Sequence, residues 1–295
     1  MSARAWFLFA AVSLIWGIPY LFIKLAIEGG MPAVSIAWAR VVLGAIALLA
    51  VAWRAGTLGS VRGRWRWLAV FAVVEVAVPF PLISAGETRI DSSTTAILIA
   101  TAPLTAALLA VRLEPEDRLT KARLGGLLVG LGGVAALVGV HVESGGGELV
   151  GVAIVLVAAC CYAFGATIIK HRLADLDPIA SMGVSLVIAA VLLTLPAALG
   201  YDGERPSDGA LGSVVVLGLV CTAAALVLMA MLVDEAGPGR ALVVTYVNPV
   251  IAVALGVVFL GESPGPGVIV GLALILAGSW LATVGLPAPS SLWTD

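Results

Sequence analysis

The chain repeats one unit of about 145 residues, and this repeat restricts the fold to an architecture of two similar halves. An apolar run with a proline in its first half and a glutamate at its end occurs at Leu98–Glu116 and again at Val244–Glu262. The same offset of 146 positions relates Pro103 to Pro249, Ile23-Lys24 to Ile169-Lys170, Pro32 to Pro178, Gly125 to Gly271, Gly132 to Gly278 and Gly139 to Gly285. We therefore predict a first repeat at residues 1–143, a Gly-rich linker at 144–149 and a second repeat at 150–295.

The hydropathy of both halves predicts a membrane protein. Hydrophobic residues make up 61% and charged residues 12% of the 295 residues, whereas soluble domains are roughly half apolar and about a quarter charged. Helices of about 20 apolar residues cross a bilayer. We predict an all-α membrane protein with ten transmembrane helices near Trp6–Ala26, Ala33–Trp53, Arg66–Gly86, Ser93–Val111, Ala122–His141, Val150–Lys170, Pro178–Gly200, Leu211–Val233, Arg240–Leu260 and Gly267–Leu286.

The distribution of Lys and Arg predicts that both termini are cytoplasmic. With the N-terminus inside, the outside loops hold only Arg89 and Arg205. The inside segments hold Arg4, Arg54, Arg62, Arg64, Arg66, Arg112, Arg118, Lys121, Arg123, Lys170, Arg172 and Arg240. Because five helices per repeat is an odd number, the second repeat enters the membrane from the opposite side. The two halves are therefore predicted to be inverted copies, an arrangement that recurs among transporters with a solute site near the midplane.

Several motifs resemble those of a known family. They are Trp16-Gly17 with Lys24 in the first segment, Pro103 followed by Glu116 and Gly125 in the first repeat, and Asn248-Pro249, Gly261-Glu262 and Gly271 in the second. Over nearly the whole chain, the sequence resembles the EamA domains of the drug/metabolite transporter superfamily, and among its members the aromatic amino acid exporters. The first repeat departs from the family pattern, because Glu114-Pro115-Glu116 stands where Gly-Glu is usual. The resemblance implies ten helices, a central cavity lined by both halves, and bracing by the fifth and tenth helices.

Aromatic residues near the middle of the predicted helices are candidates for a cavity wall that stacks on a solute. Trp16 lies about 15 Å into the first helix, away from the interfaces where tryptophan is usually found. Tyr162 occupies the matching position in the second repeat, and Tyr20 lies one turn beyond Trp16 on the same helix face. Core packing between helices is the alternative explanation for Trp16.

Prolines within the predicted helices free backbone carbonyls that a solute path could use. Each proline lacks an N–H, so a carbonyl of the preceding turn loses its bond, which is tolerated in a membrane where protein or a water-filled cavity supplies a substitute. Static kinks are the alternative. The polar groups beside these prolines complete the expected solute site, which comprises Trp16, Tyr20, Glu75, Pro79, Thr101, Pro103, Tyr162, Tyr246, Asn248 and Pro249.

Arg40 and Glu75 are charges inside predicted helices, and the second repeat has Leu186 and Cys221 at the matching positions. Intramembrane charges are costly and usually face the bundle interior or a cavity. In a hydrocarbon core of about 30 Å, the two residues are about 7 Å apart in depth. We expect them to form an intramembrane ion pair, which can be purely structural.

The remaining patterns exclude several function classes. A net charge of −2 argues against a nucleic-acid partner, and the sequence lacks the phosphate loop of ATP-driven proteins. His141 and His171 lie at helix ends far apart in sequence, so we expect no metal or other cofactor. Because no nucleophile-and-base arrangement is present, we expect no enzyme.

We expect a secondary transporter of the inner membrane that exports amino acids or related small metabolites by alternating access through a central cavity. Its partners would be the solute and the lipid bilayer, and it would act as a monomer. Two alternatives stay open: a carrier for a drug or a sugar-like metabolite, and an intramembrane enzyme that modifies lipids.

Overall fold

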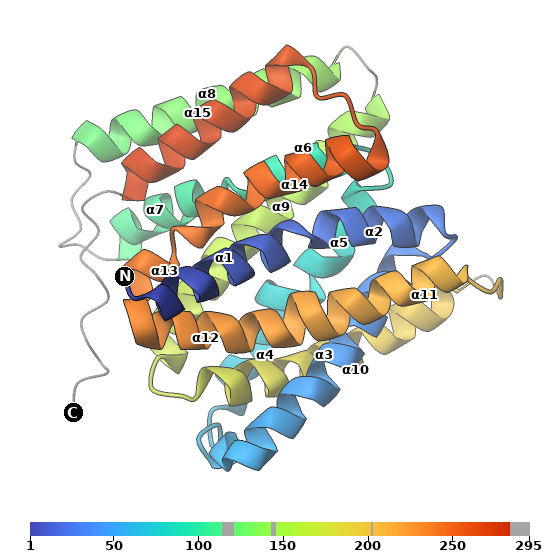
Figure 1. Ribbon diagram of the computed structural model, residues 1–295, viewed down its shortest axis with the longest axis vertical. Coiled ribbons are helices and arrows are strands. Elements are labelled where there is room, and N and C mark those ends of the chain that lie inside the picture. Colours follow the sequence, from blue (N-terminus) through green and yellow to red (C-terminus); the bar gives the residue numbers. More distant parts are fainter. Residues whose placement is uncertain (114–120, 143–145, 202, 284–295) are drawn as a thin grey trace.

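The structure is a computed structural model that describes residues 1–113, 121–142, 146–201 and 203–283. Every regular element in these residues is a helix (Figure 1). The α-helices are α1 (Ala3–Gly17), α2 (Pro19–Glu28), α3 (Ala33–Ala55), α4 (Trp65–Ala72), α5 (Pro79–Gly86), α6 (Ser92–Ile99), α7 (Ala102–Leu113), α8 (Lys121–Val142), α9 (Gly146–Ile168), α10 (Pro178–Leu199), α11 (Asp208–Val215), α12 (Ala225–Ala236), α13 (Pro238–Ala241), α14 (Val244–Leu260) and α15 (Pro266–Thr283). A short 3₁₀ helix, η1 (Thr57–Gly59), and three π-helical segments, η2 (Val73–Ala77), η3 (Ile169–Leu173) and η4 (Val216–Ala224), complete the set.

These helices supply the ten predicted transmembrane segments. Seven helical stretches of the described chain are long and apolar enough to cross a bilayer: Ala3–Glu28, Ala33–Ala55, Trp65–Gly86, Ser92–Leu109, Gly146–Leu173, Pro178–Leu199 and Asp208–Ala236. Three shorter apolar helices, Arg123–Gly139, Val244–Leu260 and Pro266–Ala282, account for the rest. Helix α9 begins at Gly146, within the predicted linker, and residues 143–145 lie outside the described part of the chain.

Prolines divide several of these segments, because a proline can begin a helix but cannot donate a bond within it. Pro19 is the first residue of α2, and Pro79 is the first residue of α5. Pro103 stands at the second position of α7, just after the break at Ala100-Thr101, whereas Pro249 lies inside α14. The first and fourth segments are therefore pairs of shorter helices, and the third consists of α4, η2 and α5.

The two repeats pack as inverted copies, because matching helices from the two halves lie antiparallel against each other. At one edge of Figure 1, α8 pairs with α15, and at the other edge α3 pairs with α10. Gly126 of α8 faces Ala282 near the end of α15, whereas Gly133, about two turns later, faces Gly271 near its start. In the other pair, Thr57 just after α3 bonds Asp177 just before α10, and Trp38 near the start of α3 bonds Thr194 near the end of α10.

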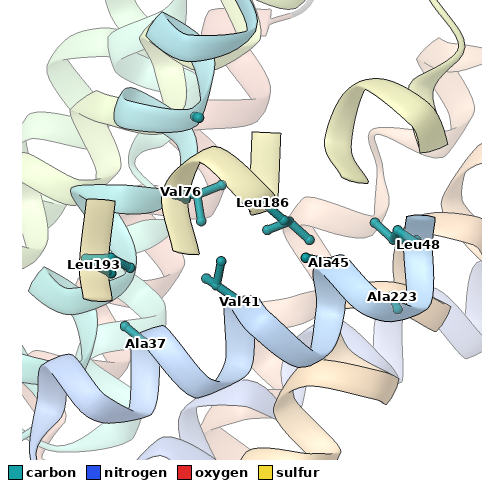
Figure 2. Packing of buried hydrophobic residues seen from close by; sticks show 10 residues of the cluster. Ala37, Val41, Ala45, Leu48, Val76, Leu186, Leu193 and Ala223 are labelled. Carbon is teal, nitrogen blue, oxygen red and sulfur yellow. The ribbon is translucent and has the colours of Figure 1, made fainter. Parts of the chain in front are cut away.

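Small side chains bring α3 and α10 together. Ala37, Val41, Ala45 and Leu48 follow the helical period along one face of α3 and are buried. Figure 2 shows them against Leu186 and Leu193 of α10, Val76 of η2 and Ala223 of η4. In contrast, Ile46 of α3 is 64% exposed and Val191 of α10 is 68% exposed. Both therefore lie on the surface that lipid would cover.

A carboxylate from the second repeat caps a helix of the first repeat. Glu262, just after α14, accepts hydrogen bonds from the backbone N–H and the hydroxyl of both Ser92 and Ser93, which begin α6. The bond from the Ser92 N–H is 2.8 Å long. Acidic groups are favourable at helix N-termini, where N–H groups have no partner within the helix. This explains why Gly261-Glu262 closes the repeated motif, whereas its counterpart Glu116 lies outside the described residues.

Candidate functional site

Arg40 lies in the second turn of α3 and is held from two sides. Its Nε donates a 2.8 Å hydrogen bond to Oγ1 of Thr222 in η4. Its Cζ lies 4.2 Å from the centroid of the Phe80 ring in α5, a cation–π distance. Thr222 is itself oriented, because its hydroxyl donates to the Leu217 carbonyl five residues earlier, across the π-helical turn. Thr222 belongs to the second repeat, so both halves position this guanidinium.

Two predicted site residues, Tyr20 and Tyr162, lie around Arg40. Both are near enough to interact electrostatically with its charge, as are Cys221 and Glu87. Tyr20 comes from α2 and Tyr162 from α9, and both pack on the same hydrophobic cluster at the contact between the two repeats. The structure therefore brings together a cation and two tyrosines from three different helices, α3, α2 and α9.

Glu75 does not form the predicted ion pair with Arg40. The carboxylate extends from η2 toward Gly165 of α9, which it touches, and its Oε2 is sealed without a hydrogen-bond partner among the described residues. Arg40 instead turns to Thr222 and Phe80. The two residues lie at compatible depths by their positions in sequence, but depth along a helix does not give the direction in which a side chain leaves it. Tyr162 is within electrostatic range of both Arg40 and Glu75.

Glu87 is a buried charge that the sequence analysis did not single out. It follows α5 directly and is 0% exposed, and neither carboxylate oxygen has a hydrogen-bond partner in the described part of the chain. Lys24 of α2 donates a 3.0 Å bond to its backbone carbonyl. Comparison of the two repeats could have identified Glu87, because the second repeat has the apolar Val233 at the matching position. Arg40, Glu75 and Glu87 are thus all charges that only the first repeat carries.

Other predicted site residues make contacts away from Arg40. Trp16 packs on the cluster of Leu8, Val12, Leu232, Ala241 and Val244. The side-chain amide of Asn248, in the orientation that satisfies its neighbours, donates to the carbonyls of Ser13 and Val244. Tyr246 donates a 3.4 Å bond to the Ser279 carbonyl in α15. These three residues join α1, α14 and their neighbours.

The break before Pro103 is bonded within the protein. The hydroxyl of Thr101 donates to the Leu98 carbonyl at 2.6 Å, and Ser279 of α15 donates to the Ala100 carbonyl at 3.2 Å. Both are protein substitutes for bonds that a continuous helix would have made. At this break the Leu98 and Ala100 carbonyls are therefore bonded within the protein in this structure. Pro79 and Pro249 are buried.

The site offers side chains for binding rather than for covalent chemistry. A fixed guanidinium, two phenols and two separate carboxyl groups can hold a polar solute through hydrogen bonds and charge. Among the residues that the structure describes, no group of three His, Cys, Asp or Glu side chains could hold a metal ion.

Comparison with known families gives two matches along the chain. Residues 3–139 and residues 149–284 each match the EamA-like transporter family. The two matched segments correspond to the two halves that pack as inverted copies.

Curated relatives match over most of their length. A "Probable terminal-alkyne amino-acid exporter" from Streptantibioticus cattleyicolor is 29% identical over 95% of this chain and 93% of its own. "Protein PagO" from Salmonella typhimurium is 27% identical over 84% of this chain and 82% of its own. An "Uncharacterized inner membrane transporter YedA" from Escherichia coli is 27% identical over 93% of this chain and 89% of its own.

A solved crystal structure has the same fold. It superimposes with a TM-score of 0.69 over 96% of this chain and 98% of that chain, at 20% sequence identity. At this identity the likeness concerns the fold alone.

Proposed function

Because the chain belongs to the EamA-like transporter family, and is therefore a multi-pass transporter of small solutes in the inner membrane rather than an enzyme, we propose that it exports amino acids by alternating access. The two inverted repeats would be the moving halves, and the solute would bind where they meet. The relative named as an amino-acid exporter supports this solute class.

The observation that carries the proposal is the group Tyr20, Arg40, Glu75 and Tyr162. All four side chains lie deep within the helix bundle, yet each keeps part of its surface accessible. Side chains that are deep and still accessible are what the lining of an internal cavity provides. The group contains a cation, a carboxyl and aromatic surfaces, which suit the carboxylate, the ammonium and the side chain of an amino acid.

The orientation in the membrane belongs to the same proposal. We place both termini in the cytoplasm, because basic residues concentrate in the loops on that side. Export then requires the cavity to open first toward the cytoplasm and next toward the periplasm. Trp16, Tyr246 and Asn248, at the contacts among α1, α12, α13, α14 and α15, would rearrange in that movement rather than bind the solute throughout. We further propose that one chain suffices, since the group around Arg40 is complete within a single copy.

Transport into proteoliposomes tests the function. The purified protein would be reconstituted, and uptake of a panel of labelled amino acids would be measured beside a labelled sugar and a cationic drug, with and without a pH gradient. We expect saturable uptake of at least one amino acid above that of protein-free vesicles. Saturable uptake of the sugar or the drug, with no amino acid transported or competing, would overturn the proposed solute class.

A further inference from the structure

The unpaired guanidinium of Arg40 needs an explanation within a helix bundle that lipid surrounds. An arginine cannot shed its charge, and an uncompensated charge in a low-dielectric interior is costly. No ion pair to Arg40 forms among the carboxylates of the described residues, and its one protein hydrogen bond uses Nε. Glu87 is near enough to interact with this charge but makes no ion pair with it, which leaves the guanidinium available to a counter-ion that arrives with a ligand.

The orientation of the side chain defines which ligand would fit. Thr222 occupies Nε, and Phe80 lies against the face of the guanidinium. The end that carries Nη1 and Nη2 has no partner among the residues the structure describes, and Arg40 is partly accessible despite its depth. Two parallel N–H groups at the end of a planar guanidinium match the two oxygens of a carboxylate in a bidentate pair.

We propose that Arg40 is the binding residue for the carboxylate group of the transported solute, with Thr222 and Phe80 as positioning residues. This inference rests on the proposed function in that the solute is taken to be an amino acid. A carboxylate fits better than a phosphate, because a single guanidinium offers one positive charge. Lys24, the other cation nearby, instead bonds the Glu87 backbone carbonyl.

Substitution of Arg40 can test binding without unfolding the protein, because Arg40 makes no ion pair that stabilises the fold. Arg40→Met removes a costly charge and fills the same volume with an apolar chain, so its melting temperature should equal or exceed that of the native protein. Its transport of a carboxylate-bearing solute should fall by about 10–100-fold, which is the range expected for losing a charge-assisted pair. Arg40→Lys keeps the charge but loses the two parallel N–H donors, so its transport rate should lie between those of the native protein and Arg40→Met. Arg205→Met, at an exposed loop position beside Asp208, is the matched control and should transport normally.

The solute itself supplies the second arm of the test. For each transported amino acid, the native protein would be given the free acid, the corresponding primary amide and inorganic phosphate as competitors. We expect the free acid to compete at least about tenfold better than the amide, and we expect this preference to vanish in Arg40→Met. Should Arg40→Met not fold, the comparison of acid and amide in the native protein decides alone. Equal competition by acid and amide, or competition by phosphate in preference to the acid, overturns the inference.

The outcome distinguishes this inference from the proposed function. If amino acids are transported and Arg40→Met has unchanged KM and rate, the export function stands and the role of Arg40 is wrong. If no amino acid is transported but another carboxylate, such as a hydroxy acid, is transported in an Arg40-dependent manner, the role of Arg40 stands and the amino-acid proposal fails.

Discussion

The role of Glu75 depends on the direction in which its side chain leaves the helix. The sequence predicts an ion pair with Arg40, and removal of one partner of a buried pair costs about 3–5 kcal/mol. In the structure Oε2 of Glu75 lies against Gly165 with no partner among the described residues. The carboxyl group therefore makes no ion pair that would stabilise the fold, and only its accessible part can act on a solute or a proton.

Glu75→Gln should consequently be well tolerated. The amide has the same shape and breaks no ion pair, so we expect the free energy of unfolding to change by less than about 1 kcal/mol. Thermal unfolding in detergent measures this, and pH-dependent uptake into proteoliposomes shows whether the carboxyl group serves transport. Gly165→Ala is a useful contrast, because its methyl group would enter the space of the Glu75 carboxylate and should lower stability. A loss of several kcal/mol in Glu75→Gln would indicate a charge partner that this structure does not contain.

At the scale of elements, the two repeats share backbone geometry at positions where their side chains differ. The π-helical segments η2 and η4 occupy matching positions in the third and eighth segments, since Glu75 of η2 corresponds to Cys221 of η4. π-helical turns often occur at functional sites. Here one of them carries Glu75 and the other carries Thr222, which holds Arg40. The same backbone device thus presents different side chains from the two halves.

The α8–α15 pair depends on glycine at the contact. A Cβ added at Gly133 would come 2.8 Å from Cγ1 of Ile275 and 2.9 Å from the Gly271 carbonyl oxygen, whereas a Cβ at Gly132 would meet nothing within 4 Å. We expect Gly133→Ala to cost about 1–3 kcal/mol, because the helices must move apart. Gly132→Ala, one residue away, should be neutral or stabilising by up to about 1 kcal/mol, since it only removes a glycine from a helix. Melting temperatures of the two variants, measured side by side, check this, and equal destabilisation would contradict it.

At the scale of the whole molecule, inversion of the repeats requires that the chain enter its second half from the other side of the membrane. The antiparallel pairs α3–α10 and α8–α15 show the inversion directly (Figure 1). Which side faces the cytoplasm depends on the basic residues of the loops, with Arg89 and Arg205 alone in the predicted outside loops.

Reporter fusions test this orientation. After Asp295, a reporter that works only in the cytoplasm should be active, and one that works only in the periplasm should be inactive. At Ser144, the two reporters should give the opposite result. Moving basic residues from the predicted inside loops to the outside loops offers a second measurement. The reporter activities should then change, because the bias of Lys and Arg in short loops sets the topology. A periplasmic C-terminus would contradict both the orientation and the number of crossings.

The sequence alone determined the architecture, because hydropathy, repetition and odd helix number are properties of the chain that need no side-chain contact. Ten apolar segments and a constant offset were enough to predict inverted five-helix repeats. Prolines within the predicted helices indicated lost backbone bonds, but only the structure showed that new helices begin at Pro19 and Pro79. Basic residues gave the expected orientation by the same kind of counting.

Only the tertiary structure decided which of the candidate residues meet. Tyr20 and Tyr162 lie near Arg40, whereas Trp16 packs on another cluster and Glu75 turns toward α9. A helix period gives the face of a residue only within its own helix, and the rotation of each helix against its neighbours is set by packing at contacts such as Gly17 with Ile251. Thr222 and Phe80 had no distinguishing signal in the sequence, because a hydroxyl and a ring become a guanidinium site only when three helical segments converge.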